Sequence, residues 1–183
     1  MKTQKQRRVV ILGFRGVGKT AITTRFINNS FNSEHTPTIE NSFKKTIKFC
    51  DEEYEIDILD TPGQDEFTRF PTNDSVITDA YILVYSVSSV NSFEILKVIH
   101  DKINEKIGTI PQVLVGNKND LEKREVKFEE GKKLAKEWSC SFIECTAKEN
   151  ENIAQVFLST LEEIEKSTNP NFGKKKDSNC LII

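Results

Sequence analysis

The sequence of 183 residues predicts an α/β fold, a single domain in which strands and helices alternate through right-handed crossovers. Short apolar runs alternate along the chain with longer segments of helical periodicity. The first run, Val9–Gly13, is continuously apolar and stops at glycine, as a buried parallel strand does. The length and the 37% share of hydrophobic residues suit one soluble domain with a sizeable core.

Five further strands are predicted after this first one. Residues 43–49 and 54–58 each alternate apolar with polar side chains, and a short polar turn separates them. This pattern is typical of a hairpin. Buried strands are expected to begin near Ala80, Gln112 and Cys140, where compact apolar runs recur.

Helical periodicity falls between these strands. After Lys19, the side chains of Ile22, Phe26 and Ile27 share one helical face. The final helix has the clearest apolar face, which is formed by Ile153, Val156, Phe157, Leu161 and Ile164. In sheets of this kind, ligands bind at the carboxyl ends of the strands, so motifs that directly follow strands are the candidates for function.

Composition excludes several classes of function. The net charge of −2 gives the chain as a whole no attraction to nucleic acid, so no nucleic-acid partner is expected. Four cysteines without a CxxC pair, together with only two histidines, argue against a zinc site. No apolar run is long enough to span a bilayer and the start lacks an apolar signal region, so an intracellular protein is expected.

The segment Gly13–Thr20, GFRGVGKT, has the spacing of a phosphate-binding loop. It follows a strand and opens a helix, which favours this interpretation over a chance glycine turn. The glycines let backbone N–H groups converge on phosphate oxygens, while Lys19 reaches the outer phosphates and Thr20 offers a hydroxyl to Mg²⁺. The loop residues expected to contact nucleotide are Gly13, Arg15, Gly16, Val17, Gly18, Lys19, Thr20 and Ala21.

The segment NKND, residues 117–120, is a candidate base reader. A carboxylate at Asp120 can accept both hydrogen bonds that the edge of guanine donates and that adenine cannot supply, and Asn117 would brace the loop. An Asx turn is the alternative, since Asn and Asp favour turns. The segment CTAK at the end of the next strand supports the base reader: the Ala147 N–H could meet the guanine carbonyl, and Lys148 could stack on the base. Lys118 and Thr146 complete the predicted pocket.

The motifs GFRGVGKT, PTIE, DTPGQ, NKND and TAK, in this order, resemble those of the Ras-type small GTPases over nearly the whole chain. The resemblance implies a P-loop, doubly wound, mixed sheet of about six strands with helices on both faces. It also implies a monomeric switch that binds GTP and GDP with Mg²⁺ and hydrolyses GTP. An ATP-using P-loop enzyme is the rival that NKND and TAK argue against.

The resemblance assigns roles to both switch segments. Thr38 would ligate Mg²⁺ and hold the γ-phosphate, and Asp60 would reach the metal through water. Gly63 would offer an N–H to the γ-phosphate and Gln64 would orient the attacking water. Phe31 would pack on guanine, although a core position at a helix end is a competing interpretation. The effector segment comprises Thr38, Ile39, Glu40, Asn41, Ser42 and Phe43.

Three positions depart from the usual Ras pattern. Pro62 stands where alanine is normal, and a harmless replacement is favoured. His35 stands where a phenol often covers the phosphate site, and an imidazole covers less. Arg15 stands where most of the family has glycine, and together with PTIENSF and GQDEFTRFP it resembles the Rheb branch.

Arg15 has three interpretations. Its bulk could crowd Gln64 and slow hydrolysis, it could point to solvent, or it could stabilise transition-state charge as an arginine finger in cis. They are ranked in that order. Crowding predicts that Arg15→Gly speeds intrinsic hydrolysis about tenfold. The Rheb resemblance implies a mostly GTP-loaded state that depends on an activating protein.

The last residues predict a lipid anchor. Residues 1–167 form the predicted GTP-binding domain, and 168–183 form a flexible basic tail. Cys180 begins CLII, which fits the C-a-a-X prenylation motif, and Lys174–Lys176 could attract anionic lipids as the second signal that one lipid needs.

The prediction is therefore a lipid-anchored GTP switch on the cytoplasmic face of plasma or internal membranes, and partly cytosolic. Its partners would be an effector, which by the Rheb resemblance would be a TOR-type kinase complex, a GTPase-activating protein and an exchange factor. The alternative is a GTP-loaded interaction module with negligible hydrolysis.

Overall fold

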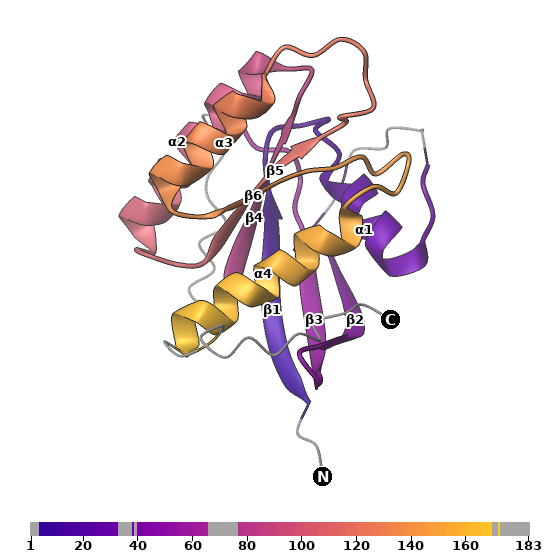
Figure 1. Cartoon of the computed structure of the whole chain (residues 1–183), viewed down its shortest axis with the longest axis vertical. Helices are drawn as coiled ribbons and strands as arrows, with labels where there is room; N and C mark the ends of the chain where they lie inside the picture. Colours follow the sequence, from indigo (N-terminus) through magenta and orange to yellow (C-terminus); the bar gives the residue numbers. More distant parts are fainter. Residues whose placement is uncertain (1–3, 33–37, 39, 66–76, 170–171, 173–183) are drawn as a thin grey trace.

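The computed structural model describes residues 4–32, 38, 40–65, 77–169 and 172. It contains a mixed sheet in the order β2-β3-β1-β4-β5-β6, which confirms the predicted fold class (Figure 1). All neighbouring strands are parallel except β2 and β3. The elements, in chain order, are β1 (Lys5–Leu12), α1 (Lys19–Asn28), β2 (Asn41–Phe49), β3 (Glu52–Asp60), β4 (Ala80–Ser86), α2 (Val90–Lys106), β5 (Gln112–Asn117), α3 (Phe128–Trp138), β6 (Ser141–Glu144) and α4 (Ile153–Thr168).

The predicted hairpin is β2–β3, and it forms one edge of the sheet. The turn residues Cys50 and Asp51 have φ of 48° and 63°, as a tight two-residue turn of the primed type requires. Phe49 and Glu52 are the last pair before this turn. The described residues therefore place β2 in register with β3 from Asn41 onward.

Helices cover both faces of the sheet, as expected (Figure 1). One hydrophobic cluster joins the sheet to α1 and α4, and Phe26 of α1 stacks on Phe157 of α4 with ring centroids 3.8 Å apart. A second cluster joins the opposite face to α2 and α3, and includes Leu96 and Leu134. Alternate residues of β1 serve the two clusters: Val9 and Ile11 belong to the first, and Val10 and Leu12 to the second.

Strand β1 begins at Lys5, earlier than the apolar run that starts at Val9 predicts. Its basic half is held by acidic partners rather than by burial of apolar side chains. Arg8 Nη2 lies 2.7 Å from a carboxylate oxygen of Asp57 on β3, and Arg7 Nη2 lies 2.8 Å from Glu165 on α4. A hydropathy pattern misses such a half-strand because the pairing charges are distant in sequence.

The last helix, α4, ends at Thr168. Beyond the helix, Phe172 packs near Phe49 with ring centroids 6.1 Å apart. The basic and CLII segments lie outside the described residues. Within the described residues, no helix is both long and apolar enough to cross a bilayer.

Candidate nucleotide site

The phosphate-loop sequence lies at the carboxyl end of β1 and leads directly into α1. Gly13 has φ of 150°, and a Cβ there would lie 2.1 Å from the carbonyl oxygen of Val84, so no larger residue fits. Gly16 and Gly18 also have positive φ, at 74° and 102°. These backbone angles produce the concave loop that the sequence predicts.

Lys19 is almost fully buried and lies back across this loop. Its Nζ donates to the carbonyl oxygens of Gly13 and Phe14 at 2.9 and 3.1 Å. Burial lowers the pKa of Lys19 to about 8, and the Asp60 carboxylate opposes that effect. Among the described residues, the hydrogen bonds of Lys19 Nζ go to carbonyl oxygens alone, so this buried cation has the capacity to receive an anionic ligand at the loop.

Three oxygen-bearing side chains from separate segments meet beside Lys19. The Thr20 hydroxyl donates to Asp60 Oδ2 at 2.7 Å and lies 2.7 Å from the Thr38 hydroxyl. Asp60 Oδ1 is buried and has no hydrogen-bond partner among the described residues, and burial raises the pKa of this carboxyl group. The three residues that the sequence assigns to a metal are thus brought together, with one carboxylate oxygen still unsatisfied.

Gln64 is buried, with 5% of its surface exposed. Its Oε1 accepts the Gly13 N–H at 3.2 Å, and its backbone N–H donates to the Gly13 carbonyl at 3.0 Å. Nε2 lies 3.5 Å from the Thr61 hydroxyl. The glutamine predicted to orient water is therefore anchored on the phosphate loop. Pro62, just before this segment's glycine, is exposed.

Arg15 and Gly63 approach each other through their backbones. A Cβ on Gly63 would lie 2.4 Å from the Arg15 Cα. The Arg15 side chain is exposed, and its guanidinium carbon lies 5.3 Å from the Phe14 ring centroid. Within the described residues no hydrogen bond joins this side chain to Gln64. The interpretation ranked first, crowding of Gln64 by the arginine side chain, therefore gains no support from the geometry, and the solvent-facing interpretation fits it better.

The NKND and TAK segments meet through one amide side chain. Asn117 is 2% exposed, and its Nδ2 donates to the Val17 carbonyl at 2.8 Å. Its Oδ1 accepts the Ala147 N–H at 3.3 Å. Asn117 therefore ties the phosphate loop to the loop of residues 145–148, which we call the base loop. An isolated Asx turn would not make these long-range bonds, so the bracing role expected of Asn117 has a physical basis.

Charged side chains surround this junction. Lys118 donates from Nζ to the Gly16 carbonyl at 2.7 Å, and burial lowers its pKa. The Asp120 side chain is 13% exposed and one of its oxygens lies 3.8 Å from Lys148 Nζ. Thr146 is buried and forms an isolated antiparallel bridge with Glu151. The predicted base-pocket residues thus lie close together.

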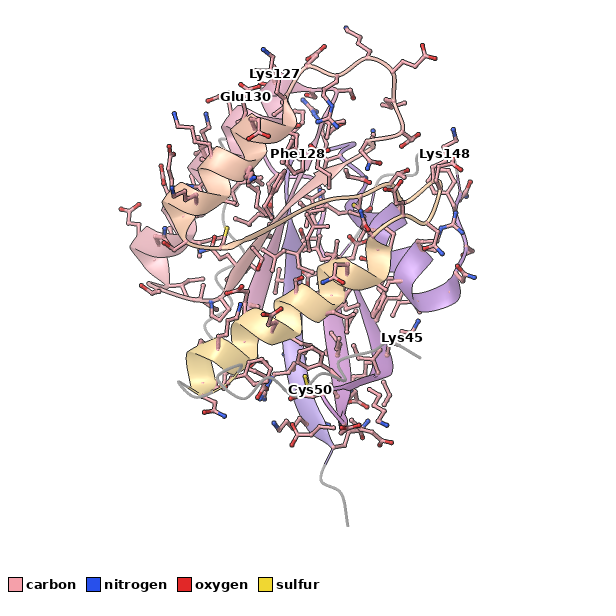
Figure 2. All side chains as sticks on the ribbon, in the orientation of Figure 1. Lys45, Cys50, Lys127, Phe128, Glu130 and Lys148 are labelled. Carbon is pink, nitrogen blue, oxygen red and sulfur yellow. The ribbon has the colours of Figure 1, made fainter. Side chains whose placement is uncertain are left out.

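Sequence reasoning missed Arg25 on α1. Its guanidinium donates to the carbonyl oxygens of Ala147 and Lys148, both at 2.8 Å, and lies 5.8 Å from the Phe31 ring centroid. Figure 2 shows Lys148 on the loop beside α1. Phe31 is 37% exposed, which excludes the competing core interpretation of that residue. A lone arginine on a helix carries no motif, so only the fold reveals this contact.

The effector segment is described in part. Glu40 is exposed, and Asn41, Ser42 and Phe43 begin the edge strand β2. The Ser42 hydroxyl donates to Asp57 of β3. Ile39, which the sequence assigns to the effector segment, lies outside the described residues. The same is true of His35, which the sequence assigns to the nucleotide site, and of Cys180.

Comparisons with known proteins agree with this arrangement. A model of the Ras family matches residues 8–166. The chain is 46% identical to the GTP-binding protein Rheb of Homo sapiens and 43% identical to the GTP-binding protein Rheb homolog of Dictyostelium discoideum, over the full length of each. It is 45% identical to the GTP-binding protein rhb1 of Schizosaccharomyces pombe, over 91% of this chain and 92% of that protein.

Proposed function

The chain belongs to the Ras family, in its Rheb branch, and from this premise we propose that it acts as a slowly hydrolysing GTP switch at a membrane surface. It is a GTP-binding protein and a GTPase. The observation that carries the proposal is the Asn117 bridge, which connects the phosphate loop to the base loop. In the proposed placement, phosphates lie against Gly13–Thr20 and guanine lies between Asp120, Phe31 and Lys148.

Mg²⁺ fits the cluster beside Lys19. Within the described residues no group of three or more His, Cys, Asp or Glu side chains could hold a metal. Mg²⁺ bound with a nucleotide needs fewer protein ligands, since phosphate oxygens and water complete its octahedron. The hydroxyls of Thr20 and Thr38 and the unsatisfied Asp60 oxygen are suitable for that role. When bound, the ion would neutralise charge on the outer phosphates.

Slow hydrolysis is supported by the position of Gln64. A glutamine can orient water only if its amide is free to reach the water, and here Oε1 is engaged by the Gly13 N–H. The same contact occupies the Gly13 N–H, which would otherwise be free to bind a phosphate oxygen. Release of Gln64 by an activating protein would then restore positioning, which suits a switch that stays GTP-loaded until it meets such a partner.

Single-turnover hydrolysis of bound GTP tests this account. We expect Gln64→Leu to change the intrinsic rate by less than about twofold, because the wild-type side chain is already engaged. Arg15→Gly is the matched comparison. Crowding by the arginine predicts an acceleration of about tenfold, whereas anchoring of Gln64 by Gly13 predicts no change beyond about twofold. A large slowing by Gln64→Leu would show that Gln64 positions water without help.

Attachment to a membrane rests on the tail motif. A prenyl group on Cys180 together with Lys174–Lys176 would supply the two signals that stable anchoring requires. Exposed residues just before and at the start of β2, such as Glu40 and Ser42, would face an effector in the GTP state. By resemblance to the Rheb branch, that effector is a TOR-type kinase complex, with an activating protein and an exchange factor as regulators.

Cys180→Ser should move the protein from the membrane fraction to the soluble fraction, because the lipid would have no other acceptor in the tail. Changing Lys174, Lys175 and Lys176 to glutamine should weaken attachment only in part, by about 1 kcal/mol for each lysine near an anionic surface. Cell fractionation with vesicle co-sedimentation measures both. A Cys180→Ser protein that stays in the membrane fraction would refute the lipid anchor.

A further inference from the structure

Arg25 contacts both segments that flank the proposed guanine site. Its Nε donates to the carbonyl oxygen of Ala147 and its Nη2 to that of Lys148, both at 2.8 Å. Its Nη1 donates to the carbonyl oxygen of Asn29 at 3.0 Å, just past the end of α1. The guanidinium also lies 5.8 Å from the Phe31 ring centroid, within range of a cation–π contact.

We propose that Arg25 is a positioning residue that sets how long guanine nucleotide stays bound. The proposal rests on the proposed function, which places the base between Phe31 and Lys148. Arg25 lies outside that space but holds both of its sides. Loosening either side lets the base leave, while the phosphate loop keeps its own contacts.

The base loop depends on such outside support because it is not part of a helix or strand. Asn117 holds it from the phosphate side through the Ala147 N–H at 3.3 Å. Arg25 holds it from the α1 side through two successive carbonyl oxygens. A second link, from Asn150 Nδ2 to Asn29 Oδ1 at 3.1 Å, joins the same two regions but bypasses the residues nearest the base.

The geometry requires arginine rather than positive charge alone. Three nitrogen atoms of one planar group reach three carbonyl oxygens on two segments. A lysine ammonium is a single point on a flexible stem and cannot satisfy all of these acceptors at once. Within the described residues no carboxylate forms an ion pair with Arg25. Its hydrogen bonds therefore fix the position of main-chain carbonyl groups and do not neutralise an acidic side chain.

We expect truncation of Arg25 to leave the protein folded. The side chain lines a cavity of about 510 Å³ between α1, β2 and α4, together with Phe26, Lys45 and Ile153. Water entering from this cavity can satisfy the carbonyl oxygens that Arg25 leaves. The main expected consequence is therefore a more mobile base loop and not an unfolded protein.

The test is the dissociation of a fluorescent GDP analogue, chased with excess GDP in Mg²⁺. Arg25→Ala should speed dissociation about tenfold or more, since it removes three charge-assisted hydrogen bonds. Arg25→Lys should recover less than half of that change on a logarithmic scale. Arg8→Ala is the matched control, because Arg8 also makes two guanidinium bonds, to Asp57 at 3.0 and 2.7 Å, but lies away from the base loop. It should leave dissociation unchanged.

Two further measurements separate positioning from general destabilisation. Single-turnover hydrolysis of preloaded GTP should not change in Arg25→Ala, because none of the contacts of Arg25 with the described residues reaches the phosphate side. Amide hydrogen exchange over residues 145–149 should accelerate in Arg25→Ala with GDP bound, and should not in Arg8→Ala. The proposal would be overturned if the GDP analogue dissociated from Arg25→Ala at a rate within about twofold of the original protein. It would also be overturned if Arg25→Lys fully recovered the original dissociation rate.

The proposed function can fail separately. If Asp120→Asn retains the GDP analogue as well as the original protein does, the guanine placement itself is wrong. If Asp120→Asn loses it and Arg25→Ala does not, only the role of Arg25 is refuted.

Discussion

Asp120→Asn should weaken GTP and GDP binding by about a thousandfold or more and shift preference toward xanthine nucleotides. In the proposed site, the carboxylate accepts two hydrogen bonds from the edge of guanine. An amide replaces one acceptor oxygen with an NH₂ donor. This donor would lie opposite an N–H donor of guanine, whereas the edge of xanthine presents a carbonyl acceptor at that place. Competition of GDP, XDP and ADP against a fluorescent GDP analogue measures the change.

Glu149→Gln provides the control for this substitution. Both carboxylates lie near Lys148 Nζ, at 3.8 Å for Asp120 and 3.4 Å for Glu149, so each change removes one acidic neighbour of the same lysine. Only Asp120 is expected to touch the base. Glu149→Gln should therefore retain guanine preference, and an equal loss in both variants would mean that the charge near Lys148, and not base reading, controls affinity.

Much of the fold could be predicted because its elements carry local signals. The apolar runs of β4 and β5 are buried throughout, and the hairpin β2–β3 shows its alternation directly. The start of β1 could not be predicted in this way. Its four polar residues are strand because distant acids on β3 and α4 pair with them, and such pairs have no signature in a local window.

The candidate site could likewise be predicted where its signals are local in sequence, and not where they depend on distant residues. Residues in compact motifs, such as Lys19 and Asn117, were found because their chemistry depends on spacing within one loop. The role of Arg25 was not predicted because its two partners in the base loop are 122 and 123 residues away and are main-chain carbonyls, which any sequence supplies. The anchoring of Gln64 also escaped prediction: a motif states which residue is present, but the rotamer that buries its amide depends on how two loops pack.

Asn117→Ala should produce the largest combined loss of affinity and stability among single changes at the site. The side chain is 2% exposed and bonds the Val17 carbonyl and the Ala147 N–H. Truncation leaves both buried groups unsatisfied, at a cost of about 1–3 kcal/mol each. It also disconnects the phosphate loop from the base loop, so binding must then order two independent segments. We expect GDP affinity to fall at least about a hundredfold.

Asn119→Ala separates this bridge from a general effect of changing the loop. Asn119 is two residues further on, and the described part of the structure gives its side chain no hydrogen bond, while its backbone N–H donates to the Cys145 carbonyl at 3.2 Å. Alanine keeps that bond. Asn119→Ala should therefore stay within about 0.5 kcal/mol of the original in thermal unfolding and retain nucleotide. If both alanine variants lose GDP equally, the strength of the site comes from loop composition, and the Asn117 bridge does not couple the phosphate loop to the base loop.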